Sequence, residues 1–266
     1  MKAARYLNCI ICLLVALLLL SPITVLAASA RDVLYQISTI DALMAGLFDG
    51  WASIDQLTKH GDFGLGTFHE LDGEMVVVDG IVYQITADGV ANKPAAAVTT
   101  PFAAVTFFDK DKIVTIPNEM DYPKLQEYLD GLLPSKNLFY AIRIDGVFTR
   151  VKTRSVPRQS KPYPRLVDVA AKQPVFEFEN VSGTIVALRC PCFVKGVNVP
   201  GYHMHFITSD RKRGGHMLDC TVKSGVVALD ITAEFDFSLP RDESFYRTDF
   251  TADSQKDLEK VEQGNK

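Results

Sequence analysis

The chain has 266 residues, with 28 Lys and Arg against 32 Asp and Glu, so its formal net charge is −4. That length is enough for one large domain or two small ones, each with a buried core. A mildly acidic surface gives no reason to expect nucleic acid or an anionic membrane as a partner, so we predict neither.

Residues 1–30 are predicted to be a signal peptide. Lys2 and Arg5 precede a long apolar run, Pro22 interrupts it, and Ala28-Ser29-Ala30 offers small residues for cleavage. An uncleaved anchor is the competing interpretation, because the apolar run is long enough to span a bilayer as a helix. The proline and the small-residue end favour removal. We therefore expect an exported protein, periplasmic or secreted, without stable membrane association after cleavage.

Strands dominate the segment that follows. Asp79-Gly80 and Asp145-Gly146 each separate two β-branched, apolar segments, which is typical of a two-residue hairpin turn. The strands expected in this half are residues 74–78, 81–86, 98–108, 112–116, 137–144 and 147–153. The expected helices are residues 40–48, 122–133, 165–172 and 252–262.

A proline-rich segment, residues 156–174, indicates a boundary near residue 160. We place an N-terminal α/β lobe at residues 31–160 and a C-terminal lobe, with the candidate site and the tail, at residues 161–266. The strands expected in the second lobe are residues 175–180, 183–190, 201–208, 216–223 and 225–234. The predicted fold class is α+β, with two mainly β lobes: a mixed sheet in the N-terminal half, an antiparallel meander in the C-terminal half, and a few packed helices.

Three of the five histidines lie within one short stretch, at His203, His205 and His216. The first two share one face of a strand, because side chains at i and i+2 point the same way. A turn near Asp210-Arg211 would bring His216 back beside His205. Three neutral imidazoles on one face would bind a divalent transition metal, with zinc preferred and other divalent metals compatible, and would leave a coordination position open.

The remaining histidines and cysteines are weaker candidates. His60 and His69 lack metal-ligand spacing and are interpreted as structural. After signal removal an odd number of cysteines remains, namely Cys190, Cys192 and Cys220. The last could pair with either of the others, and the sequence leaves both alternatives open.

Four blocks of the chain, in order, follow the pattern of one enzyme family. The histidine block, GYHMHFIT from Gly201 with Gly214-Gly215-His216 beyond it, is the most specific of them. The others are residues 62–80, 137–154 and 245–262. Together they resemble the alpha-acetolactate decarboxylases over nearly the whole mature chain. The resemblance implies a carboxy-lyase that converts 2-acetolactate to acetoin and carbon dioxide, acting as a homodimer on this small-molecule substrate.

The resemblance also implies roles for six residues. The metal ligands would be His203, His205 and His216, and the catalytic residues would be Glu74, Arg154 and Glu262. Loss of carbon dioxide leaves negative charge that spreads into the ketone oxygen as an enediolate, which a divalent metal would stabilise as a Lewis acid before protonation. The arginine could hold the carboxylate or the developing oxyanion. Either glutamate could complete the metal shell or deliver the proton, and which does which stays open.

Without the resemblance, these three catalytic candidates have ordinary interpretations. Glu74 would be an exposed hairpin residue, Arg154 an edge-strand charge, and Glu262 part of a frayed tail. Two other functions also compete with the decarboxylase. A cupin-like metal enzyme, an isomerase or oxygenase, shares the HxH pattern but normally adds a glutamate where this chain has Thr208 and Ser209. A non-enzymatic, exported zinc-binding protein would be richer in histidine.

Overall fold

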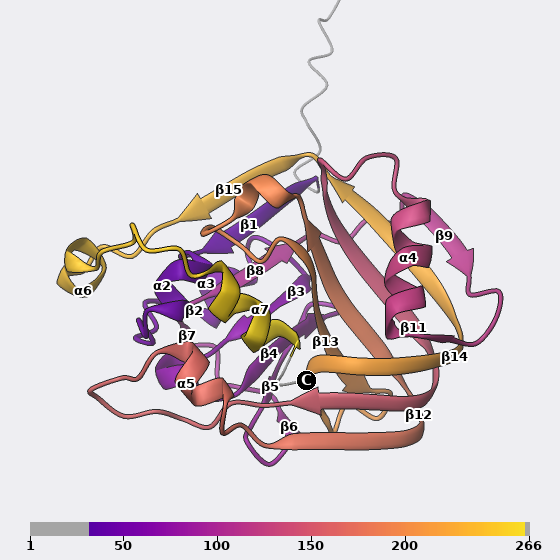
Figure 1. Cartoon of the computed structure of the whole chain (residues 1–266), viewed down its shortest axis with the longest axis horizontal. Helices are drawn as coiled ribbons and strands as arrows, with labels where there is room; N and C mark the ends of the chain where they lie inside the picture. Colours follow the sequence, from indigo (N-terminus) through magenta and orange to yellow (C-terminus); the bar gives the residue numbers. More distant parts are fainter. Residues whose placement is uncertain (1–31, 264–266) are drawn as a thin grey trace, which may run out of the picture. The chain divides into compact units, whose positions relative to one another are not determined.

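A computed structural model describes residues 32–263 of the chain (Figure 1). The predicted signal peptide, residues 1–30, lies outside the described residues. The described part belongs to one compact unit. None of its helices has both the length and the apolar character needed to cross a membrane.

The first sheet has seven strands in the order β15-β1-β8-β3-β4-β5-β6. The β1–β15 pair is parallel and the other neighbours are antiparallel. Its strands are β1 (Val33–Ile37), β3 (Phe63–Thr67), β4 (Glu74–Val78), β5 (Ile81–Ile85), β6 (Ala91–Asn92), β8 (Ala103–Thr106) and β15 (Glu234–Ser238). A separate two-stranded sheet pairs β2 (Ala52–Ser53) with β7 (Thr99–Thr100).

The second sheet has six strands, and it is antiparallel throughout. Its order is β10-β14-β11-β12-β13, with β9 beside β14. The start of β14 also pairs with β13, so that four long strands close on themselves. Its strands are β9 (Lys112–Thr115), β10 (Met120–Asp121), β11 (Phe139–Arg154), β12 (Val175–Cys190), β13 (Gly201–Thr208) and β14 (Gly214–Thr232).

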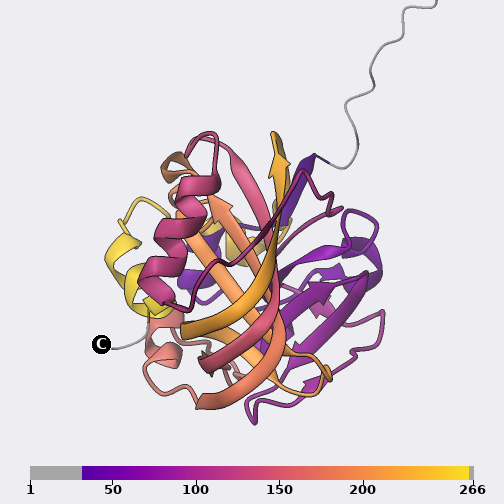
Figure 2. The same ribbon diagram turned by 90° about the vertical axis from the view of Figure 1, so that its right-hand side faces the viewer.

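Short helices pack around these sheets. They are α2 (Ile40–Met44), α3 (Ile54–Leu57), α4 (Tyr122–Leu132), α5 (Leu166–Ala170), α6 (Glu243–Arg247) and α7 (Gln255–Gln263), with 3₁₀ turns at His69–Leu71 and Cys192–Val194. Figure 2 shows α4 on the second sheet, on the side away from the first sheet. Its Leu125 and Leu129 are fully buried there. The predicted α+β class is confirmed.

The two large sheets pack face to face. Alternate residues of β4, such as Val76 and Val78, share one core cluster with Val186 and Leu188 of β12. The intervening residues of β4, Met75 and Val77, pack into a different cluster on the other side of the first sheet. Both faces of β4 are therefore covered, and every one of its residues is buried.

The three longest strands bend where their glycines meet. Gly146 of β11 lies opposite Gly183 of β12 and opposite Gly225 of β14. A Cβ on Gly183 would lie 2.4 Å from the Phe206 ring, so only glycine permits this close approach. The strands turn together in this region (Figure 1).

The predicted hairpin at Asp145-Gly146 is therefore wrong, because β11 runs through this position without a turn. The breaks predicted inside β12 and β14 are wrong for the same reason: the glycines there allow bending rather than chain reversal. The hairpin at Asp79-Gly80 is confirmed, with φ values of 54° and 72° between β4 and β5.

Neither large sheet is confined to one side of the boundary predicted near residue 160. The strands β9, β10 and β11 precede it but lie in the second sheet, whereas β15 follows it and pairs with β1. Long-range pairing distributes strands without regard to the proline-rich segment.

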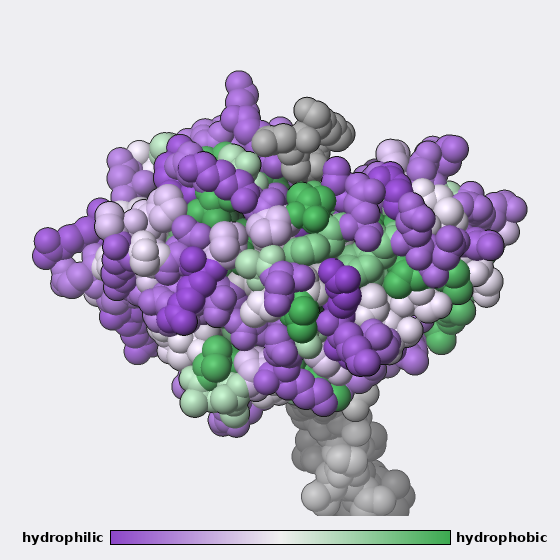
Figure 3. All heavy atoms as spheres, turned by 90° about the horizontal axis from the view of Figure 1, so that it is seen from below, coloured by the Kyte–Doolittle hydropathy of each residue, from purple (hydrophilic) through white to green (hydrophobic). Residues whose placement is uncertain are grey.

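The face seen from below in Figure 3 is mainly hydrophilic, with small separate apolar patches.

Candidate metal centre

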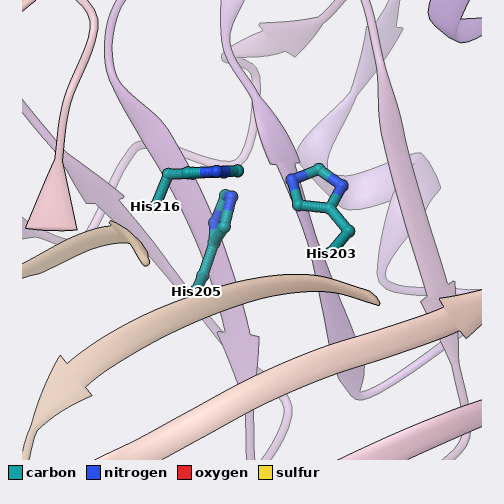
Figure 4. Close-up of side chains that lie close together, drawn as sticks. All are labelled: His203, His205 and His216. Atoms are coloured by element: carbon teal, nitrogen blue, oxygen red, sulfur yellow. The ribbon is translucent and has the colours of Figure 1, made fainter. Parts of the chain in front are cut away.

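The three predicted ligand histidines converge on one face of the second sheet (Figure 4). His205 on β13 lies directly opposite His216 on β14, and His203 shares the face of His205. Their ring centroids are 5.0 to 5.3 Å apart. One ligand nitrogen from each ring lies within 4.8 Å of the others. The predicted turn is also present, since the Arg211 amide donates to the Thr208 carbonyl at 2.9 Å.

Backbone carbonyls orient two of the rings. His205 Nδ1 donates to the Met75 carbonyl at 2.7 Å, and His216 Nε2 donates to the Glu262 carbonyl at 3.2 Å. Because a carbonyl only accepts, the other nitrogen of each ring carries a free lone pair. These nitrogens, His205 Nε2 and His216 Nδ1, together with His203 Nδ1, have no hydrogen-bond partner among residues 32–263.

All three imidazoles are held neutral. Burial lowers the pKa of His205 to about 3, although its bond to the Met75 carbonyl opposes the shift. Burial likewise lowers the pKa of His203 and His216 well below the ordinary value, and the nearby Arg154 charge adds to the effect. Three buried, neutral imidazoles with unpartnered nitrogens fit a divalent transition metal, because neutral imidazole is the form that ligates.

Arg154 and Glu74 form a buried ion pair beside the histidines. Their exposed fractions are 4% and 5%, and Arg154 Nη1 donates to Glu74 Oε1 at 2.6 Å. Glu74 Oε2 lies 3.6 Å from His205 Nε2. Burial raises the pKa of the Glu74 carboxyl to about 7, and the guanidinium opposes that shift. Their sequence contexts alone indicated surface positions for both residues, but both are buried.

Glu262 reaches the same place from the C-terminal helix. Its Oε2 lies 3.8 Å from His216 Nε2 and 3.9 Å from His203 Nε2. Burial raises the pKa of its carboxyl to about 8, with the Arg154 charge opposing and the Glu74 charge assisting. Arg154 Nη2 also donates to the Val261 carbonyl at 3.3 Å. The tail is therefore packed over the histidines rather than frayed.

Packing and ion pairs hold α7 in this position. Leu258 and Val261 are 2% and 1% exposed and belong to a core cluster with residues of α2 and α5. Arg165 donates to Asp257 at 2.8 Å, and Lys195 donates to Asp253 at 2.9 Å. The six predicted site residues thus meet at one place.

A small inner cavity of about 30 Å³ lies among these residues. His203, His216, Glu74, Arg154 and Glu262 line it, along with several apolar side chains. A cavity needs about 10–15 Å³ measured in this way to hold one water molecule, so this one has room for an ion or a water. Sequence reasoning missed the carbonyls of Met75 and Glu262 as ring-orienting groups, because backbone acceptors leave no signature in residue type.

The other candidate ligands lie elsewhere. The His60 ring stacks on Tyr35 with centroids 3.8 Å apart, and His69 Nδ1 accepts from the Gly50 amide at 3.0 Å. Neither belongs to the histidine cluster. The three cysteines are unpaired, with Cys190 and Cys220 buried and Cys192 exposed.

An α+β protein in which three converging histidines adjoin a buried arginine–glutamate pair has the make-up of a metal-binding active site. The sequence profile described as alpha-acetolactate decarboxylase matches residues 34–252. The chain belongs to the alpha-acetolactate decarboxylase family.

Individual relatives agree with this assignment. The alpha-acetolactate decarboxylase of Methanosarcina mazei is 53% identical over 234 residues, which cover 88% of this chain and 81% of that protein. That of Methylococcus capsulatus is 43% identical over 228 residues, covering 86% and 88%. The crystal structure of alpha-acetolactate decarboxylase from Bacillus subtilis strain 168 matches with a TM-score of 0.85 at 38% identity, covering 88% of this chain and 100% of that one. Family membership favours the decarboxylase hypothesis over the cupin-like enzyme and the zinc-binding protein.

Proposed function

We propose that this chain is a carboxy-lyase that converts 2-acetolactate to acetoin and carbon dioxide. Membership of the alpha-acetolactate decarboxylase family supports the substrate and the reaction. The observation that carries the mechanism is the convergence of three buried imidazoles beside the Arg154–Glu74 ion pair. Decarboxylation places negative charge on the ketone oxygen, and this site concentrates groups that can stabilise it.

His203, His205 and His216 would hold a divalent transition metal, with zinc preferred. When bound, such an ion supplies Lewis-acid stabilisation to oxygen atoms that gain negative charge. The Met75 carbonyl keeps the His205 ring in the tautomer whose Nε2 has a free lone pair, and the Glu262 carbonyl orients the His216 ring. The family assignment supports this use of the histidines, and their neutral state is compatible with it.

Arg154 orients the anionic substrate. Two of its nitrogens are engaged, by Glu74 and by the Val261 carbonyl, and its Nε has no partner among residues 32–263. A buried guanidinium N–H without an acceptor is available to a carboxylate or to a developing oxyanion. The ion pair with Glu74 keeps the planar group in place while this happens.

Glu262 delivers the proton to the new carbanion. Its side chain lines the inner cavity and also the larger cleft outside it, so it can exchange protons with solvent between turnovers. Glu74 is committed to Arg154 and supports that residue instead. The Glu262→Gln variant should then release acetoin of lower enantiomeric purity, because solvent would protonate both faces.

Acetoin formation from 2-acetolactate by the purified protein tests the function, with a blank without protein to measure spontaneous decarboxylation. Treatment with a chelator should abolish the enzymatic rate, and adding back zinc, manganese, iron or cobalt one at a time should identify the metal that restores it. A rate equal to the blank would refute the reaction. A full rate after complete metal removal would refute the role of the histidines.

The exported location and the homodimer are further proposals. The positive region and apolar run before Ala28-Ser29-Ala30 support export to the periplasm or beyond the cell. The family resemblance supports the dimer. Fractionation with N-terminal sequencing of the mature protein and sedimentation of the purified chain would test them.

A further inference from the structure

A second, larger cavity lies on the other side of Glu262. This outer cleft has a volume of about 440 Å³ and lies between α4, α7 and the start of β13. Tyr122, Gln126, Arg189, Tyr202 and Glu262 are among its lining residues. Glu262 lines both this cleft and the inner cavity, so the cleft adjoins the candidate metal centre at that residue.

Arg189 is a buried cation in the wall of this cleft. It lies on β12 opposite Tyr202 of β13, and it is only 7% exposed. Its Nη1 donates to the Lys136 carbonyl, and its Nε has no hydrogen-bond partner among residues 32–263. No carboxylate in this described part of the chain forms an ion pair with it. Burying a guanidinium without an anion is costly, which indicates that a ligand supplies one.

An acidic side chain that feels the charge of Arg189, Asp130, is already engaged. Its Oδ1 accepts from the Tyr202 hydroxyl at 2.7 Å, and its Oδ2 accepts from Lys136 Nζ at 2.5 Å. Burial opposes the shift, but the hydrogen bonds from Lys136 and Tyr202 lower the pKa of the Asp130 carboxyl, and the charge of Arg189 contributes to this lowering. Lys136 neutralises Asp130, and the charge of Arg189 is left for another partner.

The remaining charges of the cleft would repel an anionic substrate. Glu259 also lines it, and the whole chain has a net charge of −4. A substrate anion therefore needs a cation in the cleft, and Arg189 is the only arginine or lysine among the described residues that line it.

We propose that Arg189 forms a carboxylate-binding subsite in the outer cleft, which captures a small 2-hydroxy or 2-oxo acid anion before it passes Glu262. The proposal rests on the proposed function, because it takes the anionic substrate from it. Arg189 is a recruiting residue here: it lies in the outer cleft, away from the cavity lined by the histidines.

Kinetic measurements on full-length variants separate recruitment from chemistry. The Arg189→Gln variant should raise KM for 2-acetolactate about tenfold, the loss of one charge-assisted hydrogen bond, with kcat within about twofold of wild type. Arg189→Lys should recover part of the loss because it keeps the charge. Arg241→Gln removes an equal charge from an exposed position and should leave both constants unchanged. A fall in kcat with unchanged KM would overturn the proposal.

Direct binding gives a readout that does not need turnover. Isothermal titration with isobutyrate, a carboxylate that is not a substrate, should show about tenfold weaker binding to Arg189→Gln than to wild type. The neutral product acetoin should bind both equally. Equal binding of isobutyrate to both proteins would overturn the proposal even if acetoin is formed. Binding that depends on Arg189 in a protein that forms no acetoin would instead refute only the proposed function.

The Asp130→Asn variant should change the affinity for isobutyrate in the opposite direction from Arg189→Gln. Removing this negative charge should tighten isobutyrate binding about twofold to threefold, because the repulsion in the cleft falls. A gain of affinity cannot arise from misfolding, so this variant guards against a merely unstable Arg189→Gln protein. Weaker or unchanged binding to Asp130→Asn would contradict an anion subsite at Arg189.

Discussion

Arg154 of β11 lies directly opposite His216 of β14, which in turn lies opposite His205 of β13. Three of the six predicted site residues therefore occupy one row across three hydrogen-bonded strands. Their spacing is determined by the backbone of the sheet, and only the side-chain rotamers remain to be chosen. Such a row is a rigid base for a site, because strands hold functional groups more accurately than loops do.

The His205→Ala variant should lose both the bound metal and acetoin release. His205 supplies an unpartnered Nε2 at 0% exposure, and two imidazoles hold a divalent ion far less firmly than three. Elemental analysis and an acetoin assay measure the two effects. His60→Ala is the matched control, since that ring stacks on Tyr35 outside the cluster, and it should keep metal and activity. An active, metal-free His205→Ala protein would refute the site.

The tail should be required for activity but not for the fold of the sheets. A chain that ends at Asp257 lacks Glu262 and should lose turnover. It also lacks the buried side chains of Leu258 and Val261, so its free energy of unfolding should fall by about 2 kcal/mol or more.

The Glu262→Gln variant separates these two effects. It keeps both apolar side chains, so its melting temperature should stay within a few degrees of wild type while kcat falls by about a hundredfold or more. Wild-type kcat in Glu262→Gln would contradict proton delivery by this residue. Full activity in the truncated chain would exclude any role for the tail.

The glycine at the bend of β12 should be intolerant of a methyl group. In Gly183→Ala the new Cβ would lie 2.4 Å from the ring of Phe206, which is fully buried. We expect the free energy of unfolding to fall by about 2 kcal/mol, as in other overpacked cores. Urea denaturation monitored by circular dichroism measures it.

Gly131→Ala in α4 is the control for that substitution. A Cβ at Gly131 would meet no atom within 4 Å, and alanine favours a helix more than glycine does. This variant should be unchanged or more stable by up to about 1 kcal/mol. Equal losses in both variants would show that the close approach at Gly183 has no energetic weight.

Asp230 should make stability depend on pH, at a place remote from the histidines. The residue is 0% exposed, its Oδ2 accepts from the Asp109 amide at 3.1 Å, and its Oδ1 has no partner among residues 32–263. Burial raises the pKa of its carboxyl to about 7, and the charges of Asp111, Asp32 and Asp109 add to the shift. In the folded protein this carboxyl therefore keeps its proton at pH values where the unfolded chain releases it.

The stability that the protonated Asp230 carboxyl contributes is fully present below about pH 4 and is lost as the pH rises to about 7. Asp230→Asn cannot ionise, so its free energy of unfolding relative to wild type should rise between pH 4.5 and 7.5, by on the order of 2 kcal/mol. Urea denaturation of both proteins at the two pH values measures the difference. A difference that does not change with pH would show that Asp230 is already ionised in the fold.

Local patterns predicted the elements that depend on local chemistry. Asp79-Gly80 forms a turn because both residues adopt positive φ and the flanking strands are short and apolar. The histidine hairpin was predictable for the same reason, since the i, i+2 rule and one turn determine where His216 returns. Asp145-Gly146 has the same dipeptide signal but lies inside a long strand, because pairing with β12 and β14 on both sides outweighs turn propensity.

The sequence by itself determined the α+β class, the hairpin that pairs His205 with His216, and, through family resemblance, the residues of the site. Only the tertiary structure decided that Glu74 and Arg154 are buried partners and that Glu262 returns to them from the end of the chain. Residues 80 positions apart or more meet through sheet packing and helix docking, and these long-range contacts have no periodic signature along the chain. Arg189 was missed for the same physical reason, because its lack of an ion-pair partner among residues 32–263 exists only in the folded chain.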